Sequence, residues 1–140
     1  MRKGMQLGDR GVGAGKGNGT SLVLIAEDEP ASRSLLHRYL SMEGYAVISA
    51  ADGAEALEEF RRSPKQVALC LIDLHLPGLD GVSLIREIRK ISRSVPIFLM
   101  SGLSEEEDSL EDVRDEILKR FVKPFDWQTL LHQIRRLLND

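Results

Sequence analysis

Polar residues follow four apolar stretches of this chain, at the point where each stretch ends. Glu27 and Asp28 follow the first stretch, and Asp73, Ser101 and Lys123 follow three others. A carboxylate can attack phosphorus to form an aspartyl phosphate, while a hydroxyl and an ammonium can stabilise the transferred group. Clustered carboxylates repel each other unless a cation neutralises them, and all-oxygen ligation is typical of Mg²⁺ rather than zinc. If these groups meet, Asp73 is the expected nucleophile.

The apolar stretches themselves have the pattern of buried strands. Residues 67–72 form a nearly unbroken apolar run, as expected for a strand buried on both faces of a parallel sheet. A segment of helical periodicity follows each of five such strands, which predicts a doubly wound α/β domain with helices on both faces. The carboxyl ends of parallel strands share one edge, so the polar groups should meet there. The expected strands cover residues 22–26, 45–49, 67–72, 95–100 and 119–122.

Several helix starts can also be read from the sequence. Pro30 suits the first turn of a helix, and Glu29 before it is expected to be a helix-start residue rather than a metal ligand. Asp80 and Asp126 can cap the helices that follow them. Trp127 begins the apolar face of the last helix, so we expect it to pack in the core.

The first 20 residues differ in composition from the rest of the chain. They hold seven of the twelve glycines and few apolar side chains, which is typical of a flexible tether or an expression remnant. The phosphate-binding pattern G-x-x-x-x-G-K-[ST] would require glycine at Arg10 and a hydroxyl at Gly17, so a nucleotide loop is not expected here. The folded domain should therefore cover residues 21–140.

The bulk composition excludes several classes of protein. With 140 residues, 42% hydrophobic and 29% charged, the chain fits one compact domain. A net charge of −3 provides no basic field for nucleic acid. The single cysteine, Cys70, lies in an apolar stretch and fits a reducing compartment. No apolar run approaches the roughly 18 residues of a membrane span, and no secretory signal is evident, so we expect a cytoplasmic protein without membrane contact.

Four motifs, in order along the chain, resemble those of the receiver domains of two-component response regulators. They are LVLIAEDEP, LIDLHLPGLDG, FLMSG and FVKPF, and the resemblance covers residues 21–140. This resemblance implies a five-stranded parallel sheet of order 2-1-3-4-5 in a flavodoxin-like fold. It also implies that Asp73 is the phospho-acceptor, with Lys123 and Ser101 around the phosphoryl group.

The resemblance further implies a metal site and partners. Mg²⁺ would be held by Asp28, Asp73 and the backbone carbonyl of His75, with Glu27 acting through water. The phosphoryl group would come from a histidine kinase or a histidine phosphotransfer protein. Output would pass to a protein partner through the face formed by the fourth helix, the fifth strand and the last helix, and a second copy of the chain is a further candidate partner. Slow self-dephosphorylation would serve signalling, so the chain is not expected to be a metabolic enzyme.

The chain departs from the family pattern three residues before Lys123. The family usually has tyrosine or phenylalanine there, and this chain has Arg120. Phe121 cannot substitute, because side chains alternate across a strand and it should face the other way. Residues 104–116 contain eight acids, which predict either a solvated helix or a partner-selecting surface. We hypothesise that Arg120 pairs with these acids in the unphosphorylated state.

Two other functions compete with a phospho-acceptor. A phosphatase with an aspartyl nucleophile would resemble D-x-D-x-[TV], which requires aspartate at His75, so the sequence disfavours it. A pseudo-receiver would bind partners without phosphorylation. The presence of the acidic pair, Asp73, Ser101 and Lys123 weakens that alternative.

Overall fold

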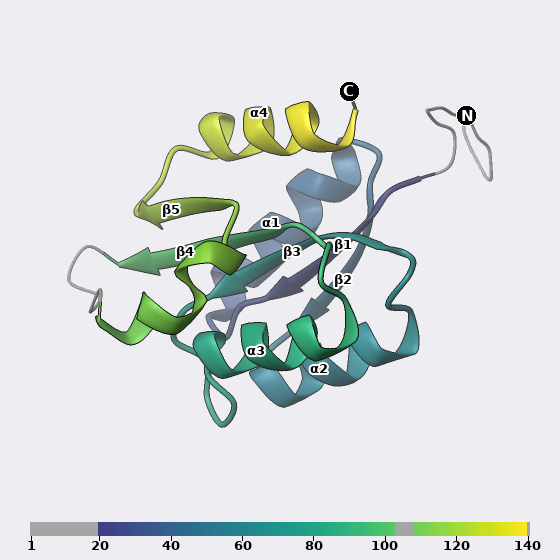
Figure 1. Ribbon diagram of the computed structural model, residues 1–140. Helices are drawn as coiled ribbons and strands as arrows, with labels where there is room; N and C mark the ends of the chain where they lie inside the picture. The colour runs from purple at the N-terminus through teal and green to yellow at the C-terminus, as the bar shows by residue number, and fades with distance from the viewer. Residues whose placement is uncertain (1–19, 103–107, 140) are drawn as a thin grey trace.

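The computed structural model describes residues 20–102 and 108–139, and strands alternate with helices throughout (Figure 1). Every strand begins and ends within two residues of its expected position. The strands are β1 (Leu22–Ala26), β2 (Ala46–Ala50), β3 (Val67–Asp73), β4 (Ile97–Gly102) and β5 (Lys119–Lys123). The helices are α1 (Pro30–Met42), α2 (Gly53–Arg62), α3 (Gly81–Ile91), the 3-10 helix η1 (Asp108–Glu116) and α4 (Trp127–Leu138).

All five strands are parallel, and their order is β2-β1-β3-β4-β5, which confirms the predicted doubly wound sheet. The chain winds from β1 outwards to β2 and then returns past β1 to β3, so the winding direction changes between β1 and β3. Ligands in open α/β sheets bind beyond the carboxyl ends of the strands at such a switch point. The acids after β1 and at the end of β3 therefore lie where a site is expected.

Two helical layers cover the sheet, with α1 and α4 on one face and α2, α3 and η1 on the other (Figure 1). Side chains of β3 alternate between these layers. Leu69 and Leu71 pack with α1 and α4, whereas Cys70 and Ile72 pack with α2 and α3. Burial raises the pKa of the Cys70 thiol to about 12, so the thiol stays protonated at neutral pH and packs as an apolar group. None of the helices in residues 20–102 and 108–139 is long and apolar enough to cross a bilayer.

The helix starts follow the expected capping chemistry. The backbone N–H of Ser32 donates to Glu29 Oε1 at 2.7 Å, which confirms Glu29 as a helix-start residue. Asp80 caps α3 and Asp126 caps α4 in the same way. Trp127 is half-buried and packs edge-on against the rings of Tyr39 and Phe125, each at a centroid distance of 5.3 Å. Each of the three caps satisfies a backbone N–H at the start of its helix.

The described part of the acidic segment after β4 is helical, as expected, but it forms a 3-10 helix. Residues 103–107 lie outside the described part of the chain, and the remainder forms the 3-10 helix η1. A 3-10 helix places residues three apart on the same side. Leu110 and Val113 have this spacing, and both are buried in the core under α3. The apolar pair therefore fits the tighter helix, which buries both side chains in one row.

Candidate functional site

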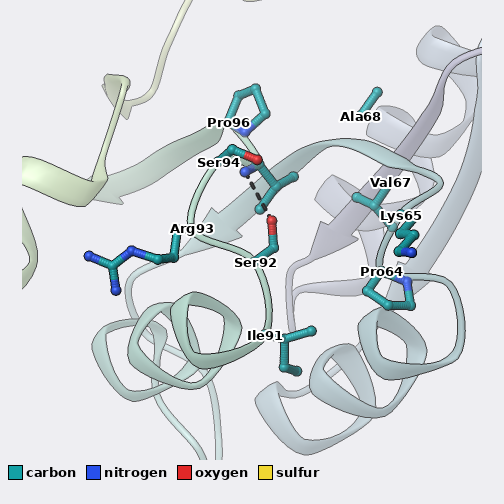
Figure 2. Close-up of a pocket in the computed structure, with 10 residues that line it drawn as sticks. Pro64, Lys65, Val67, Ala68, Ile91, Ser92, Arg93, Ser94 and Pro96 are labelled. Atoms are coloured by element: carbon teal, nitrogen blue, oxygen red, sulfur yellow. Dashed lines mark hydrogen bonds between the residues drawn. The ribbon is translucent and has the colours of Figure 1, made fainter.

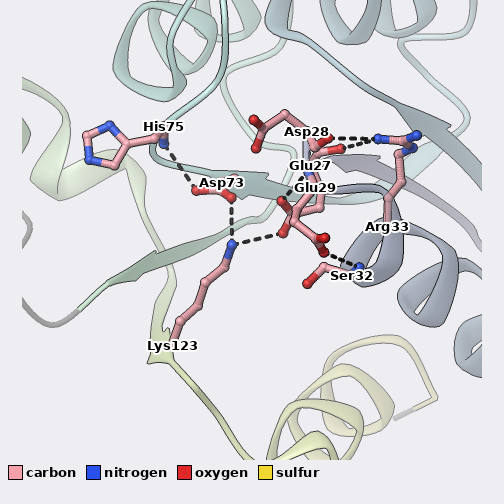
Figure 3. Close-up of polar contacts among 8 residues, drawn as sticks. All are labelled: Glu27, Asp28, Glu29, Ser32, Arg33, Asp73, His75 and Lys123. Carbon is pink, nitrogen blue, oxygen red and sulfur yellow. Dashed lines mark hydrogen bonds and ion pairs between the residues drawn. The ribbon is translucent and has the colours of Figure 1, made fainter.

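Lys123 joins two carboxylates at the carboxyl edge of the sheet. Its Nζ donates to Asp73 Oδ2 at 2.6 Å and to Glu27 Oε1 at 2.9 Å (Figure 3). These groups come from β5, β3 and the end of β1, so the structure brings together three of the predicted residues from distant segments. The Glu27 side chain is 1% exposed and that of Lys123 is 32% exposed. The ammonium group thus contacts a buried acid, while the Lys123 side chain remains partly exposed to solvent.

Backbone groups orient the same two carboxylates. The N–H of His75 donates to Asp73 Oδ1 at 3.1 Å, and the N–H of Glu29 donates to Glu27 Oε2 at 3.1 Å. The His75 ring is exposed and points away from the carboxylates (Figure 3). Both oxygens of each acid therefore have a donor, which limits rotation of the side chains. The prediction that the His75 carbonyl is a metal ligand stays a prediction.

Three carboxylates are close enough to share a cation. One oxygen each from Glu27, Asp28 and Asp73 lies within 4.8 Å of the others. Burial raises the pKa of Glu27, and the neighbouring Asp73 charge adds to this rise, while the bond from Lys123 opposes it. Burial alone would lower the pKa of Lys123, but its bonds to Asp73 and Glu27 raise it overall. The Lys123 ammonium bonds to two of these three acids, and the all-oxygen donor set fits Mg²⁺.

Arg33 supports the acidic loop, and the sequence reasoning missed it. Its Nη1 donates to the carbonyl oxygens of Glu27 at 3.0 Å and Asp28 at 3.2 Å (Figure 3). Arg33 lies in the first turn of α1, where a cation is unfavourable because the N-terminal end of a helix carries partial positive charge. The unfavourable position of a basic residue at the start of a helix was the sequence feature that could have indicated a role for Arg33.

Ser101 lies near this cluster but has a different immediate partner. It is fully buried and pairs with Val122 in the β4–β5 register, one residue beyond the residue that pairs with Asp73. Arg120 Nε donates to Ser101 Oγ at 3.0 Å. Among the described residues, Ser101 forms no direct hydrogen bond with Asp73. The sequence reasoning placed Ser101 at the correct edge but did not foresee its bond to Arg120.

Phe121, next to Arg120 in β5, was expected to face the opposite side of the sheet. Phe121 packs on the opposite face of the sheet with Phe98 at 5.3 Å between ring centroids, as side-chain alternation predicts.

Two acids of η1 form ion pairs with α3. Arg86 Nη2 lies 2.6 Å from Asp112 Oδ2, and Arg89 Nε lies 2.7 Å from Glu116 Oε1. The hypothesis that Arg120 pairs with the acidic segment rests partly on residues 103–107, which lie outside the described residues.

Two glycines allow the loop after Asp73 to pack closely against the helices. A Cβ on Gly81 would lie 2.5 Å from the carbonyl oxygen of Asp73. A Cβ on Gly53 would lie 1.8 Å from the carbonyl oxygen of Leu79. Both distances are far below van der Waals contact, so the start of α2 and the loop before α3 require glycine. Gly81 belongs to a recognised motif, whereas nothing local to Gly53 indicated its role.

A separate pocket lies at the amino edge of the sheet. It has a volume of about 580 Å³ and is formed where the chain enters β3 and β4 (Figure 2). Its wall includes Pro64, Lys65, Ile91 and Pro96, and the Arg93 side chain extends away from the hollow. None of the predicted site residues lines this pocket. The predicted chemistry therefore belongs to the carboxyl edge.

A 2-1-3-4-5 parallel sheet with acids at the switch point and a lysine at the end of β5 defines the architecture of a receiver. The family model described as "Response regulator receiver domain" matches residues 23–135, so the chain belongs to that family. This finding confirms the resemblance drawn from the four motifs.

The chain is also similar in sequence to proteins named as transcriptional regulators. The chain is 40% identical over 116 residues to the protein named "Probable transcriptional regulator ycf27" of Porphyridium aerugineum, a match covering 83% of this chain and 47% of that protein. It is 39% identical over 119 residues to the transcriptional regulatory protein CseB of Streptomyces coelicolor, covering 83% of this chain and 48% of that protein. The chain thus spans about half the length of these curated relatives.

Solved structures show the same fold. The receiver domain of sensor histidine kinase PA1611 from Pseudomonas aeruginosa, solved with a magnesium ion in its active-site cleft, has a TM-score of 0.74 and 29% identity, and the match covers 85% of this chain and 98% of that one. A response regulator receiver protein from Pseudomonas putida has a TM-score of 0.75 and 27% identity, with the same coverage. The magnesium ion was found in the structure of the P. aeruginosa protein.

Proposed function

We propose that this chain is the phospho-accepting receiver of a two-component or phosphorelay system. The observation that carries the proposal is the 2.6 Å contact between Lys123 Nζ and buried Asp73 at the switch point of the sheet. An Asp73 carboxylate oxygen forms a bond to phosphorus while the phosphorus–nitrogen bond of a donor phosphohistidine breaks, and the electron pair stays on the imidazole. The donor is a histidine kinase or a histidine phosphotransfer protein.

The residues of the cluster divide this work. Asp73 has its Oδ1 held by the His75 backbone, which orients the carboxylate for attack. Lys123 supplies a positive charge beside the phosphoryl position, where negative charge develops on the equatorial oxygens. Glu27, Asp28 and Asp73 would hold Mg²⁺, which neutralises phosphoryl charge when bound. Their spacing and all-oxygen donors support this assignment.

Incubation with acetyl phosphate tests the proposed reaction. We expect the intact mass of the wild type to rise by one phosphoryl group with Mg²⁺ and to stay unchanged with a chelator. Asp73→Asn keeps the size of the side chain but removes the nucleophile, so it should show no gain. Asp112→Asn on η1 is the control and should gain the group as the wild type does. A wild type that stays unmodified would favour the pseudo-receiver.

We also propose a cytoplasmic protein whose output passes through protein contacts made by η1, β5 and α4. β5 is an edge strand. Leu118 directly before it is 54% exposed, and Val122 within it is 37% exposed. The names of the relatives associate those proteins with transcription, which is compatible with a receiver that acts through another domain. Hydrogen exchange with and without the phosphoryl group should change at β5 and η1. Changes confined to α2 and β2 would contradict this output face.

A further inference from the structure

Arg120 stands where the family usually has an aromatic residue, and its side chain contacts Ser101 of the site. Arg120 pairs with Leu99 in the β4–β5 register, and both Leu99 and Ser101 lie on the sheet face covered by α3 and η1. The Arg120 side chain reaches along this face to Ser101 Oγ, 3.0 Å from its Nε. Ser101 is fully buried and Arg120 is half-buried, so the hydroxyl end of this bond is shielded from water.

The chemistry of the two groups fixes the direction of this bond. A guanidinium N–H donates and cannot accept, so Ser101 Oγ is the acceptor. The hydroxyl proton of Ser101 is therefore not used in this contact, and the hydroxyl can donate to another acceptor. An aromatic side chain at position 120 would leave the hydroxyl without this charged donor.

We propose that Arg120 is a positioning residue that sets the Ser101 hydroxyl as a hydrogen-bond donor to the phosphoryl group on Asp73. This inference rests on the proposed function. A phosphoryl oxygen accepts hydrogen bonds and carries negative charge, so a hydroxyl that already accepts from a cation donates to it more strongly. Arg120 thereby links β5 to the occupancy of the site through β4.

Binding of beryllofluoride with Mg²⁺ tests the proposal, because its fluorine atoms accept the hydrogen bonds that phosphoryl oxygens accept. Arg120→Met removes the donor, and we expect affinity to fall about tenfold, as for loss of one charge-assisted hydrogen bond. Arg120→Lys keeps a charged group that can only donate, so it should restore most of the affinity. Arg93→Met at the amino edge is the matched control and should bind as the wild type does.

A double-mutant cycle separates positioning from a general structural role. In a Ser101→Ala background, Arg120→Met should cause little further loss, because the hydroxyl that Arg120 orients is absent. The ¹⁹F spectrum of the bound ligand should change in the same way in both single variants. Thermal unfolding of each variant confirms that it is folded.

The outcomes distinguish this inference from the proposed function. Wild-type affinity in Arg120→Met, or losses that add in the double variant, would overturn the positioning role while leaving Asp73 as the acceptor. A wild type that neither binds beryllofluoride nor gains a phosphoryl group would overturn both.

Discussion

The amino edge of the sheet has a pocket, whereas the carboxyl edge has a cluster of charged side chains in contact. At the amino edge, a pocket of about 580 Å³ has no acidic residue in its lining, and the Arg93 side chain extends away from it. At the carboxyl edge, Glu27, Asp73 and Lys123 are in direct contact in a largely buried cluster. The proposed chemistry therefore belongs to the edge where charged groups converge, and not to the edge with the pocket.

The polarity of the βα unit explains this difference. Helices that follow parallel strands begin at the carboxyl edge, where their N-terminal ends favour negative charge. They end at the amino edge, and α2 and α3 carry basic residues in their last turns, which are Arg61, Arg62, Arg89 and Lys90. Phosphoryl groups and carboxylates are thus favoured at one edge, while the other edge is occupied by helix ends and their cations.

The largest expected difference between the edges is in reactivity. Lys123→Met removes the ammonium that contacts Asp73, and we expect phosphoryl incorporation from acetyl phosphate to slow about 100-fold, as for loss of one preorganised charged donor. Lys65→Met removes an ammonium at the amino edge and should leave the rate unchanged. Initial rates from intact mass measure both. Equal effects of the two substitutions would break the distinction between the edges.

The second expected difference is in packing. Gly53→Ala at the carboxyl edge forces the start of α2 away from Leu79, and we expect the free energy of unfolding to fall by about 3 kcal/mol. Gly44 at the amino edge has φ +100° and no heavy atom within 4 Å of an added Cβ. Gly44→Ala should therefore cost about 1 kcal/mol, from backbone strain alone. Urea unfolding compares them, and a larger loss for Gly44→Ala would reverse the comparison.

The smallest expected effect is stabilisation by metal. Mg²⁺ at about ten times its dissociation constant should stabilise the wild type by about 1.4 kcal/mol, which raises the melting temperature by a few degrees. Asp28→Asn should lose this rise, because it removes one of the three clustered carboxylates. Asp112→Asn, which breaks a pair on η1, should keep it. An unchanged rise in Asp28→Asn would exclude Asp28 as a ligand.

Most of the fold could be predicted because its signals are local. The buried run before Asp73 and the capping acids Asp80 and Asp126 act within a few residues of themselves. The 3-10 form of η1 was missed, since the spacing of Leu110 and Val113 fits both kinds of helix until the packing against α3 is known. Arg33 and Gly53 were missed because their partners are backbone atoms. The unfavourable position of a base in the first turn of α1 signalled Arg33, whereas nothing local signalled Gly53.

The sequence by itself determined which chemical groups stand at the strand ends, and the alternation of strands with helices determined that these ends share one edge. Tertiary structure alone decided which groups touch. Lys123 reaches Glu27 across 96 positions of sequence, and Arg120 reaches Ser101 between neighbouring strands. These contacts depend on strand order, register and the reach of long side chains, which are set only when the whole sheet packs.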